Sequence, residues 1–159
     1  MRLVPKEELR SRIAKLQQRL RSGDIDAALI SQNSDLYYFA GIVQQAWLFV
    51  PAEGEPALLV KKSFERARQG CALDQVVPLD NPRNLLKVLT DLGFNKPARL
   101  GLELDVLPVK HYWRHLEVFK PAETVDISAQ ILSLRQVKTA YEIQIMREAA
   151  ELSDFMQAT

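Results

Sequence analysis

The sequence contains a single cysteine, Cys71, among its 159 residues, and it lacks any long uninterrupted apolar run. One cysteine excludes an intrachain disulfide, which suits a reducing compartment. No segment approaches the ~20 apolar residues that a membrane span needs, and the first residues lack the apolar stretch of a signal peptide. We therefore expect a soluble, cytoplasmic protein that has no membrane partner.

The familiar motifs of catalysis and phosphate binding are also missing. There is no glycine-rich phosphate loop, no Gly-x-Ser-x-Gly elbow and no Cys-x-x-Cys pair. His111 and His115 are spaced four residues apart, which would suit two metal ligands on one helical face, but no Asp or Cys cluster accompanies them. Glu103 and Asp105 follow an expected strand and are interpreted as solvated loop residues. We expect no catalytic residue, metal site or cofactor in this chain.

Neither sign of charge dominates the chain, which has 21 Lys and Arg against 20 Asp and Glu. Positive charge is concentrated in residues 1–23, which carry seven basic and two acidic side chains. This segment has no interleaved aromatic residues, and the rest of the chain is net acidic. We interpret it as a helix with a solvated basic face and expect no nucleic-acid partner.

Apolar residues at 47% and charged residues at 26% indicate one folded domain with a sizeable core. Leu9, Ile13, Leu16 and Leu20 recur at helical spacing and predict a first helix that ends at Gly23. The remaining signals predict helices at 33–39, 63–69, 81–92 and 108–116, and strands at 25–31, 46–50, 56–60, 75–78, 99–102 and 124–127.

Short apolar strands that alternate with helices indicate an α/β fold. The turn at 51–55 has hairpin length, so the strands on either side of it should pair antiparallel. We expect a three-layer sandwich in which a mixed sheet of roughly six strands has helices on both faces, followed by a linker helix. Residues 1–127 would form this domain, and residues 128–159 would be a linker and the start of the first helix of an absent domain.

The last segment carries its own signals. Thr139 followed three residues later by Glu142 is a capping box, which predicts a helix from there to residue 159. We expect its apolar stripe to be a contact surface for a further domain or a second copy of the chain. The alternative is that the helix folds back onto its own sheet, because apolar stripes usually serve the nearest core. The stripe consists of Tyr141, Ile145, Ala149, Leu152 and Met156.

Two runs of the sequence are more specific than the rest, and together they resemble a known family. Residues 26–41 contain the pair Tyr37-Tyr38 shortly before Gly41, and residues 125–150 contain the capping box. The first run resembles the first strand and Tyr-rich turn of the creatinase/prolidase N-terminal domain, which has a ribonuclease H-like fold. The second resembles the linker and first helix that lead into the pita-bread metallopeptidase domain of Xaa-Pro dipeptidases and aminopeptidase P.

The resemblance implies that this chain is the non-catalytic N-terminal domain of a Xaa-Pro metallopeptidase, a hydrolase whose substrates are proline-containing peptides. Divalent metal ions (manganese, cobalt or zinc) would be held by two Asp, one His and two Glu in the absent catalytic domain. The domain would contact its own catalytic domain, contribute to a homodimer and narrow the active-site entrance. The chain alone would have no peptidase activity.

By the same resemblance, the loop after Gly41 is the segment expected to reach a substrate cleft. The alternative, which we favour for its tryptophan, is a core position on the following strand, with the two glutamines lining a solvent-exposed loop. Some relatives carry a basic or aromatic side chain here, so the Gln-Gln pair leaves the substrate open. The candidate gate residues are Tyr38, which would brace the loop, and Val43, Gln44, Gln45 and Trp47.

Two other functions fit the same resemblance. Some histone-chaperone subunits resemble this fold without its metal ligands, so a non-catalytic protein-binding module is one alternative. The N-terminal domain of a creatine-hydrolysing enzyme is the other, and its chemistry would also lie in the absent domain. The prolidase-like linker favours the peptidase.

Overall fold

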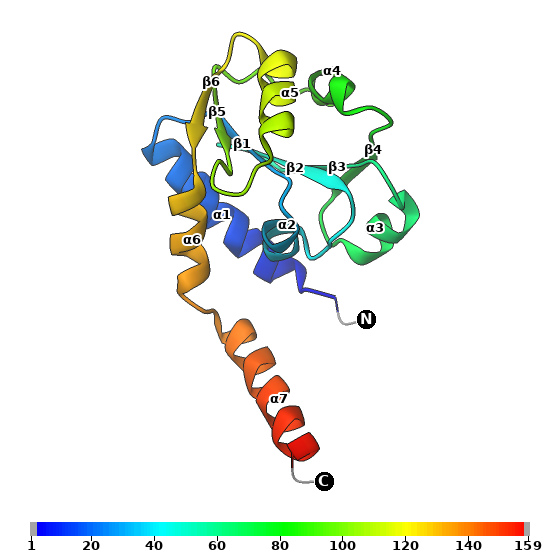
Figure 1. The fold of residues 1–159 in the computed structure, drawn as a ribbon, viewed down its shortest axis with the longest axis vertical. Coiled ribbons are helices and arrows are strands. Elements are labelled where there is room, and N and C mark those ends of the chain that lie inside the picture. Colours follow the sequence, from blue (N-terminus) through cyan, green and yellow to red (C-terminus); the bar gives the residue numbers. More distant parts are fainter. Residues whose placement is uncertain (1–2, 158–159) are drawn as a thin grey trace.

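A six-stranded mixed sheet forms the centre of the computed structural model, which describes residues 3–157 (Figure 1). The strands lie in the order β4-β3-β2-β1-β5-β6. β2 pairs antiparallel with both β1 and β3, and the other neighbours are parallel, which confirms the mixed sheet and the predicted hairpin. The strands are β1 Ala27–Ile30, β2 Ala46–Pro51, β3 Ala57–Val60, β4 Gln75–Pro78, β5 Arg99–Leu102 and β6 Glu123–Asp126.

Helices cover both faces of the sheet, as the alternating sequence pattern predicts. One face carries α1 Lys6–Ser22, α2 Asn33–Ala40, α3 Phe64–Gly70 and α6 Ser128–Gln136. The other carries a short 3-10 helix, Pro82–Asn84, with α4 Leu85–Asp91 and α5 Val109–Phe119. The last helix, α7 Ala140–Gln157, extends away from this body (Figure 1).

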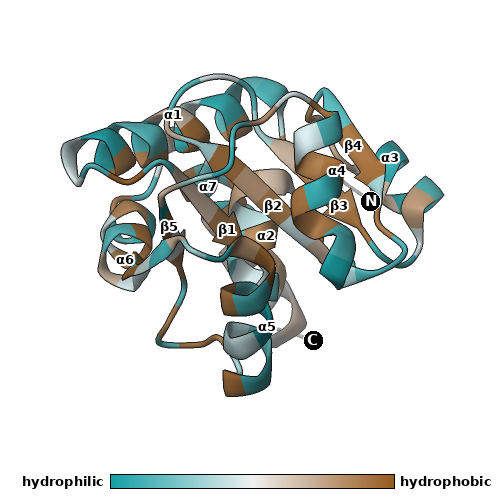
Figure 2. Ribbon diagram, turned by 90° about the horizontal axis from the view of Figure 1, so that it is seen from above, coloured by the Kyte–Doolittle hydropathy of each residue, from teal (hydrophilic) through white to brown (hydrophobic). Residues whose placement is uncertain are grey.

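The central strands are buried on both sides, and their residues alternate between two cores. Ile30 and Leu48 pack with the helices of the α1 face, whereas Leu29 and Phe49 pack with α4 and α5. This burial explains why β1 and β3 are continuous apolar runs and do not alternate with polar residues. Figure 2 shows the same arrangement, with mostly hydrophobic central strands between helices that also carry hydrophilic residues.

Several local predictions are confirmed by the backbone. The predicted apolar stripe of α1 is buried, and Asn81 caps the 3-10 helix by accepting a hydrogen bond from the Arg83 N–H. The N-cap of α2 is Gln32, whose Oε1 accepts a hydrogen bond from the Asp35 N–H. Gln32 performs here the role that shorter polar side chains usually perform.

Most of the segment 128–138, which the sequence analysis interprets as a linker, forms the helix α6. Asp126 stabilises the first turn by accepting hydrogen bonds from the Ser128 N–H and hydroxyl. Ile131 is a buried core residue, and α6 contacts α1. At the junction, a side chain on Gly101 would approach Ile127 to 2.7 Å, so the glycine allows β5 and the start of α6 to pack closely. α6 is thus packed on the body of the domain.

Candidate functional site

Two open cavities contain most of the predicted site residues. The first, which we call the strand-end cleft, lies beyond the carboxyl ends of the parallel strands β1 and β5 and has a volume of about 560 Å³. The second, the α7 groove, lies between α7 and the helices α1 and α2 and has a volume of about 590 Å³. In open α/β sheets, ligands bind preferentially outside the carboxyl ends of strands.

The strand-end cleft is built from loops that follow three different elements. Its walls come from the β1–α2 loop, the α2–β2 loop and the loop between β5 and α5. Apolar residues such as Leu107 and Pro108 lie beside the polar ones, a composition typical of small-molecule sites. The polar and aromatic side chains of its wall belong to Ser31, Gln32, Gln45, Trp47, Glu103 and His111.

The structure brings three of the five predicted gate residues together in this cleft. Val43 is 51% exposed, Gln45 is exposed, and both line the cleft with Trp47. Gln44 is half-buried and does not line it, and the Gln44 Oε1 has no hydrogen-bond partner among the described residues. Tyr38 lines the α7 groove and does not line the strand-end cleft.

Trp47 occupies a core position on β2, which is the placement that the alternative interpretation expects. It is 5% exposed and packs in the core on the α4 and α5 side of the sheet. Its indole Nε1 is buried and has no acceptor among the described residues. Trp47 is therefore both a packing residue and part of the cleft wall.

Glu103 is a cleft residue that sequence reasoning missed, because the carboxylate was expected to be solvated. It is 2% exposed, and its Oε2 accepts hydrogen bonds from the N–H groups of Ser31 (2.9 Å) and Gln32 (3.2 Å). Burial raises the pKa of Glu103 to about 8, with the nearby Asp35 carboxylate as a further cause. The one available signal was its position directly after a buried parallel strand.

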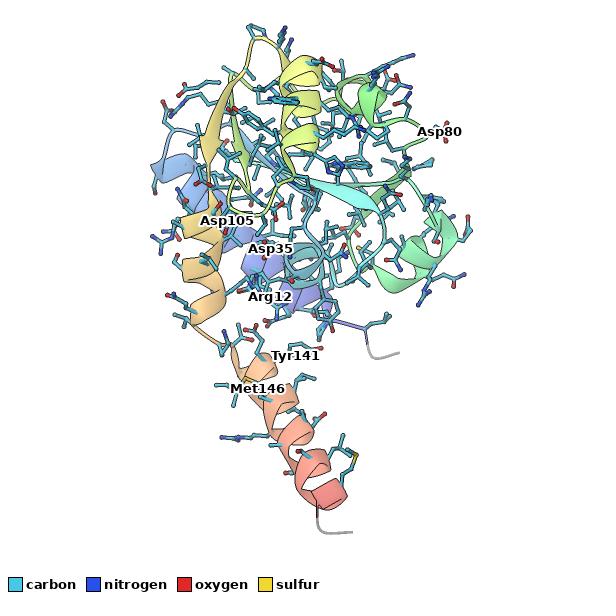
Figure 3. All side chains as sticks on the ribbon, viewed as in Figure 1. Arg12, Asp35, Asp80, Asp105, Tyr141 and Met146 are labelled. Atoms are coloured by element: carbon cyan, nitrogen blue, oxygen red, sulfur yellow. The ribbon has the colours of Figure 1, made fainter. Side chains whose placement is uncertain are left out.

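A buried arginine joins three helices at the base of the α7 groove. Arg12 Nε donates to Glu8 Oε1 at 2.9 Å, and Nη1 donates to the Tyr38 carbonyl at 2.7 Å. Its Nη2 lies 3.5 Å from Glu142 Oε1, and the guanidinium stacks 4.3 Å from the centre of the Tyr38 ring. Figure 3 shows Arg12 close to the point where α7, with Tyr141 in its first turn, meets the body.

The predicted capping box is present and is extended by a contact to α1. The Thr139 N–H donates to Glu142 Oε2, and the Glu142 N–H donates to Thr139 Oγ1. The Thr139 hydroxyl also donates to Glu8 Oε1 at 2.8 Å. The Tyr38 hydroxyl donates to the Leu134 carbonyl, and burial raises the pKa of Tyr38. We call Glu8, Arg12, Thr139 and Glu142 the α7 latch, since together they fix the first turn of α7.

The apolar stripe of α7 is only partly covered. Tyr141 and Ile145 are half-buried and line the α7 groove together with Ala149 and Leu152. Leu152 is nevertheless 67% exposed, and Met156 is 77% exposed. The helix points away from the sheet (Figure 1), so the alternative in which it folds back onto its own sheet is wrong.

The two histidines lie on α5 in different environments. His115 is buried, and its pKa is lowered to about 4 by burial first and then by His111 and Arg114. His111 is half-buried in the wall of the strand-end cleft. Within residues 3–157, no group of three or more His, Cys, Asp or Glu side chains could hold a metal ion.

A helix that crosses a membrane must be both long and predominantly apolar. Over the part of the chain that the structure describes, no helix combines the length and the apolar character needed to cross a bilayer.

Comparison with known families and structures agrees with this architecture. The family model of the Creatinase/Prolidase N-terminal domain matches residues 12–137. The chain belongs to this family. The match includes α6, in agreement with the packing of that helix on the body.

The relatives of this creatinase/prolidase domain include peptidases and a creatinase from a Bacillus species. An uncharacterized peptidase of Staphylococcus haemolyticus is 28% identical over 91% of this chain and 42% of its own length. The Xaa-Pro dipeptidase of Pyrococcus horikoshii is 24% identical over 92% of this chain and 40% of its own length. A crystal structure of a proline dipeptidase from Streptococcus pneumoniae superposes with a TM-score of 0.70 at 27% identity, covering 79% of this chain and 98% of that one. The chain thus spans about two fifths of the curated relatives.

Proposed function

We propose that this chain serves as the non-catalytic N-terminal domain of a Xaa-Pro peptidase, in which residues 1–127 form the α/β domain and residues 128–159, beginning with the packed helix α6, lead into the catalytic domain. The family match over residues 12–137 carries this proposal. The Pyrococcus relative is a Xaa-Pro dipeptidase more than twice as long as the region that it shares with this chain. The catalytic groups, and the divalent metal ions expected with them, would then lie outside this chain.

The strand-end cleft supports a role in shaping the entrance to an active site. Val43 and Gln45 are exposed on its rim, and Trp47 supports the wall behind them. The apolar Val43 side chain would tolerate the pyrrolidine ring of a proline-containing peptide, and the Gln45 amide would offer the peptide a hydrogen bond. We infer that this rim narrows access for longer peptides.

The α7 stripe supports the second part of the role, which is contact with a catalytic domain. Leu152 and Met156 are large apolar side chains left exposed on one helix, and such patches mark contact surfaces. The α7 latch holds the helix in one direction. A homodimer in a cytoplasmic location is part of the same proposal, and the single buried cysteine fits that location.

The coding sequence downstream of codon 159 provides the first test. A continuing frame that encodes Asp, Asp, His, Glu and Glu ligands in this order supports the proposal. A frame that ends at this codon contradicts it. A pita-bread domain that lacks these ligands would favour the protein-binding module instead.

Activity of the encoded protein provides the second test, and it addresses the cleft. With a Xaa-Pro dipeptide and then a longer Xaa-Pro peptide as substrates, we expect Gln45→Ala to change KM for the longer peptide more than kcat. Gln17→Ala is the matched control, because Gln17 lies on α1 and hydrogen-bonds the β2–β3 turn, away from the cleft. Equal effects of the two variants would contradict the role of the rim.

A further inference from the structure

Glu103 is held in a setting where an ionised carboxylate is unfavourable. The side chain is 2% exposed. Its Oε2 accepts two backbone hydrogen bonds, from Ser31 and Gln32. Its Oε1 is buried and receives no hydrogen bond from any donor among the described residues. An unpaired oxygen of a buried carboxylate costs free energy, so Oε1 requires a proton or a partner.

Asp35 offers the acceptor that a protonated Oε1 would need. Asp35 lies in the first turn of α2 and is 6% exposed, and both a side-chain hydrogen bond and the charge of Asp35 are among the causes that raise the pKa of Glu103. Its Oδ1 accepts a hydrogen bond from Arg135 Nη1 at 2.7 Å. Two carboxyl groups can be hydrogen-bonded to each other only when one of them carries a proton.

We propose that the buried Glu103 carries a proton at neutral pH and donates it in a hydrogen bond to Asp35, and that this carboxyl pair positions one wall of the strand-end cleft. The pair connects the end of β5 to the β1–α2 loop and to the first turn of α2. Ser31 and Gln32 of this loop line the cleft, as does Asn33 at the start of α2. Through Arg135 it also reaches α6. Glu103 is thus a positioning residue that acts through the backbone of this loop.

The other titratable or charged side chains considered around the pair come from three neighbouring elements. Arg135 from α6 contacts Asp35 directly. His111 from α5 lines the same cleft as Glu103. Asp126, at the end of β6, is occupied by hydrogen bonds from Ser128 and Leu104, which hold its pKa below the ordinary value. When Glu103 loses its proton, two buried carboxylates therefore face one directly bonded guanidinium.

The dependence of stability on pH follows from the direction of the Glu103 shift. Burial is the main cause that raises the pKa of Glu103 from 4.5 to about 8, and Asp35 also raises it, whereas the backbone hydrogen bonds from Ser31 and Gln32 lower it. Between these values, the folded protein holds a proton on Glu103 that the unfolded chain has released. The stabilisation associated with this proton is complete below pH 4.5, falls as the pH rises through the window, and is lost above about pH 8.

Glu103→Gln distinguishes the effect of the proton on Glu103 from the effect of side-chain packing at this position. The glutamine carbonyl can still accept from Ser31 and Gln32, and its amide can donate to Asp35 without titrating. We expect the melting temperature of the 159-residue chain to fall between pH 5 and pH 8.5 more steeply than that of Glu103→Gln. His111→Gln is the control, because it removes the imidazole from the cleft but leaves Glu103 in place. Its melting temperature should therefore fall with pH as steeply as that of the wild type.

Carbon-13 NMR of the Glu103 carboxyl group tests the same proposal in the unmodified chain. We expect a titration midpoint near 8, which moves to lower pH in Asp35→Asn because the neighbouring charge is gone. The proposal is overturned if the wild-type midpoint lies within about one unit of the ordinary Glu value. Parallel melting curves of the wild type and Glu103→Gln would overturn it as well. Should Glu103→Gln not fold, the NMR midpoint alone decides.

Discussion

The body of the domain and α7 are held in place by different interactions. In the body, both faces of the sheet are covered by helices, and side chains such as Leu16 and Phe49 are almost completely buried. On α7, Leu152 and Met156 remain exposed, and the direction of the helix depends on hydrogen bonds and ion pairs in its first turn. Apolar burial thus stabilises the body, whereas polar contacts orient α7.

This difference indicates that the two regions should respond differently to mutation. A buried apolar side chain contributes about 1.5–3 kcal/mol, and many such residues act together in a core. A helix cap contributes about 1 kcal/mol and acts locally. We therefore expect the body to unfold cooperatively, while α7 changes its order or direction without unfolding the body.

The largest effect is expected at Arg12, which belongs to both regions. Arg12→Met would leave the half-buried Glu8 carboxylate and the Tyr38 carbonyl without their charged partner. Breaking a buried ion pair in this way costs about 3–5 kcal/mol of unfolding free energy, measurable by urea denaturation. Arg10→Met is the matched control on the same helix, since Arg10 is exposed and pairs only weakly with the exposed Asp74. Similar losses for both variants would show that the α7 latch is not a stabilising cluster.

A smaller loss is expected from Ile131→Ala, which tests whether α6 belongs to the body. Ile131 is buried in the core on the α1 face, so its truncation should cost about 2–5 kcal/mol. The neighbouring Leu132 is half-exposed, and Leu132→Ala should have little effect. A negligible loss for Ile131→Ala, read from the same denaturation curves, would instead support the predicted boundary at residue 127.

The smallest effect is expected from Thr139→Ala. The change removes the capping hydroxyl and its bond to Glu8, which should destabilise the first turn of α7 by about 1 kcal/mol. Hydrogen exchange should accelerate in residues 140–146 while the exchange of β1 and β2 stays unchanged. Ser153→Ala, at an exposed position of the same helix, is the control. Faster exchange in β1 as well would show that α7 and the body form one cooperative unit.

Much of the fold could be predicted because its signals are local. The helical stripe of α1, the turn between β2 and β3, and the capping box of Thr139 each depend on residues within a few positions of one another. Such patterns follow from backbone geometry and short-range hydrogen bonds. α6 escaped prediction because its nine residues have a short periodic pattern, and its stability depends on packing against α1.

The candidate site was predicted only in part, since its polar groups meet across long sequence separations. Val43, Gln45 and Trp47 lie close together in the sequence and line one cleft. The family resemblance indicated their loop as a candidate site. No local sequence signal indicated that Glu103, which is 72 residues after Ser31, lies in the wall of the same cleft. Sequence patterns show which residues are polar, but they do not show which polar residues become buried together.

By itself, the sequence determined the strands, the α/β class, the start of α7 and the family, because these depend on periodicity, capping and ordered motifs. Only the tertiary structure decided that Arg12 and Glu103 are buried, that α6 joins the body, and that Tyr38 and Trp47 line different cavities. The physical reason is that desolvation and pairing of charges are set by neighbours that the folded sheet brings together from distant parts of the chain.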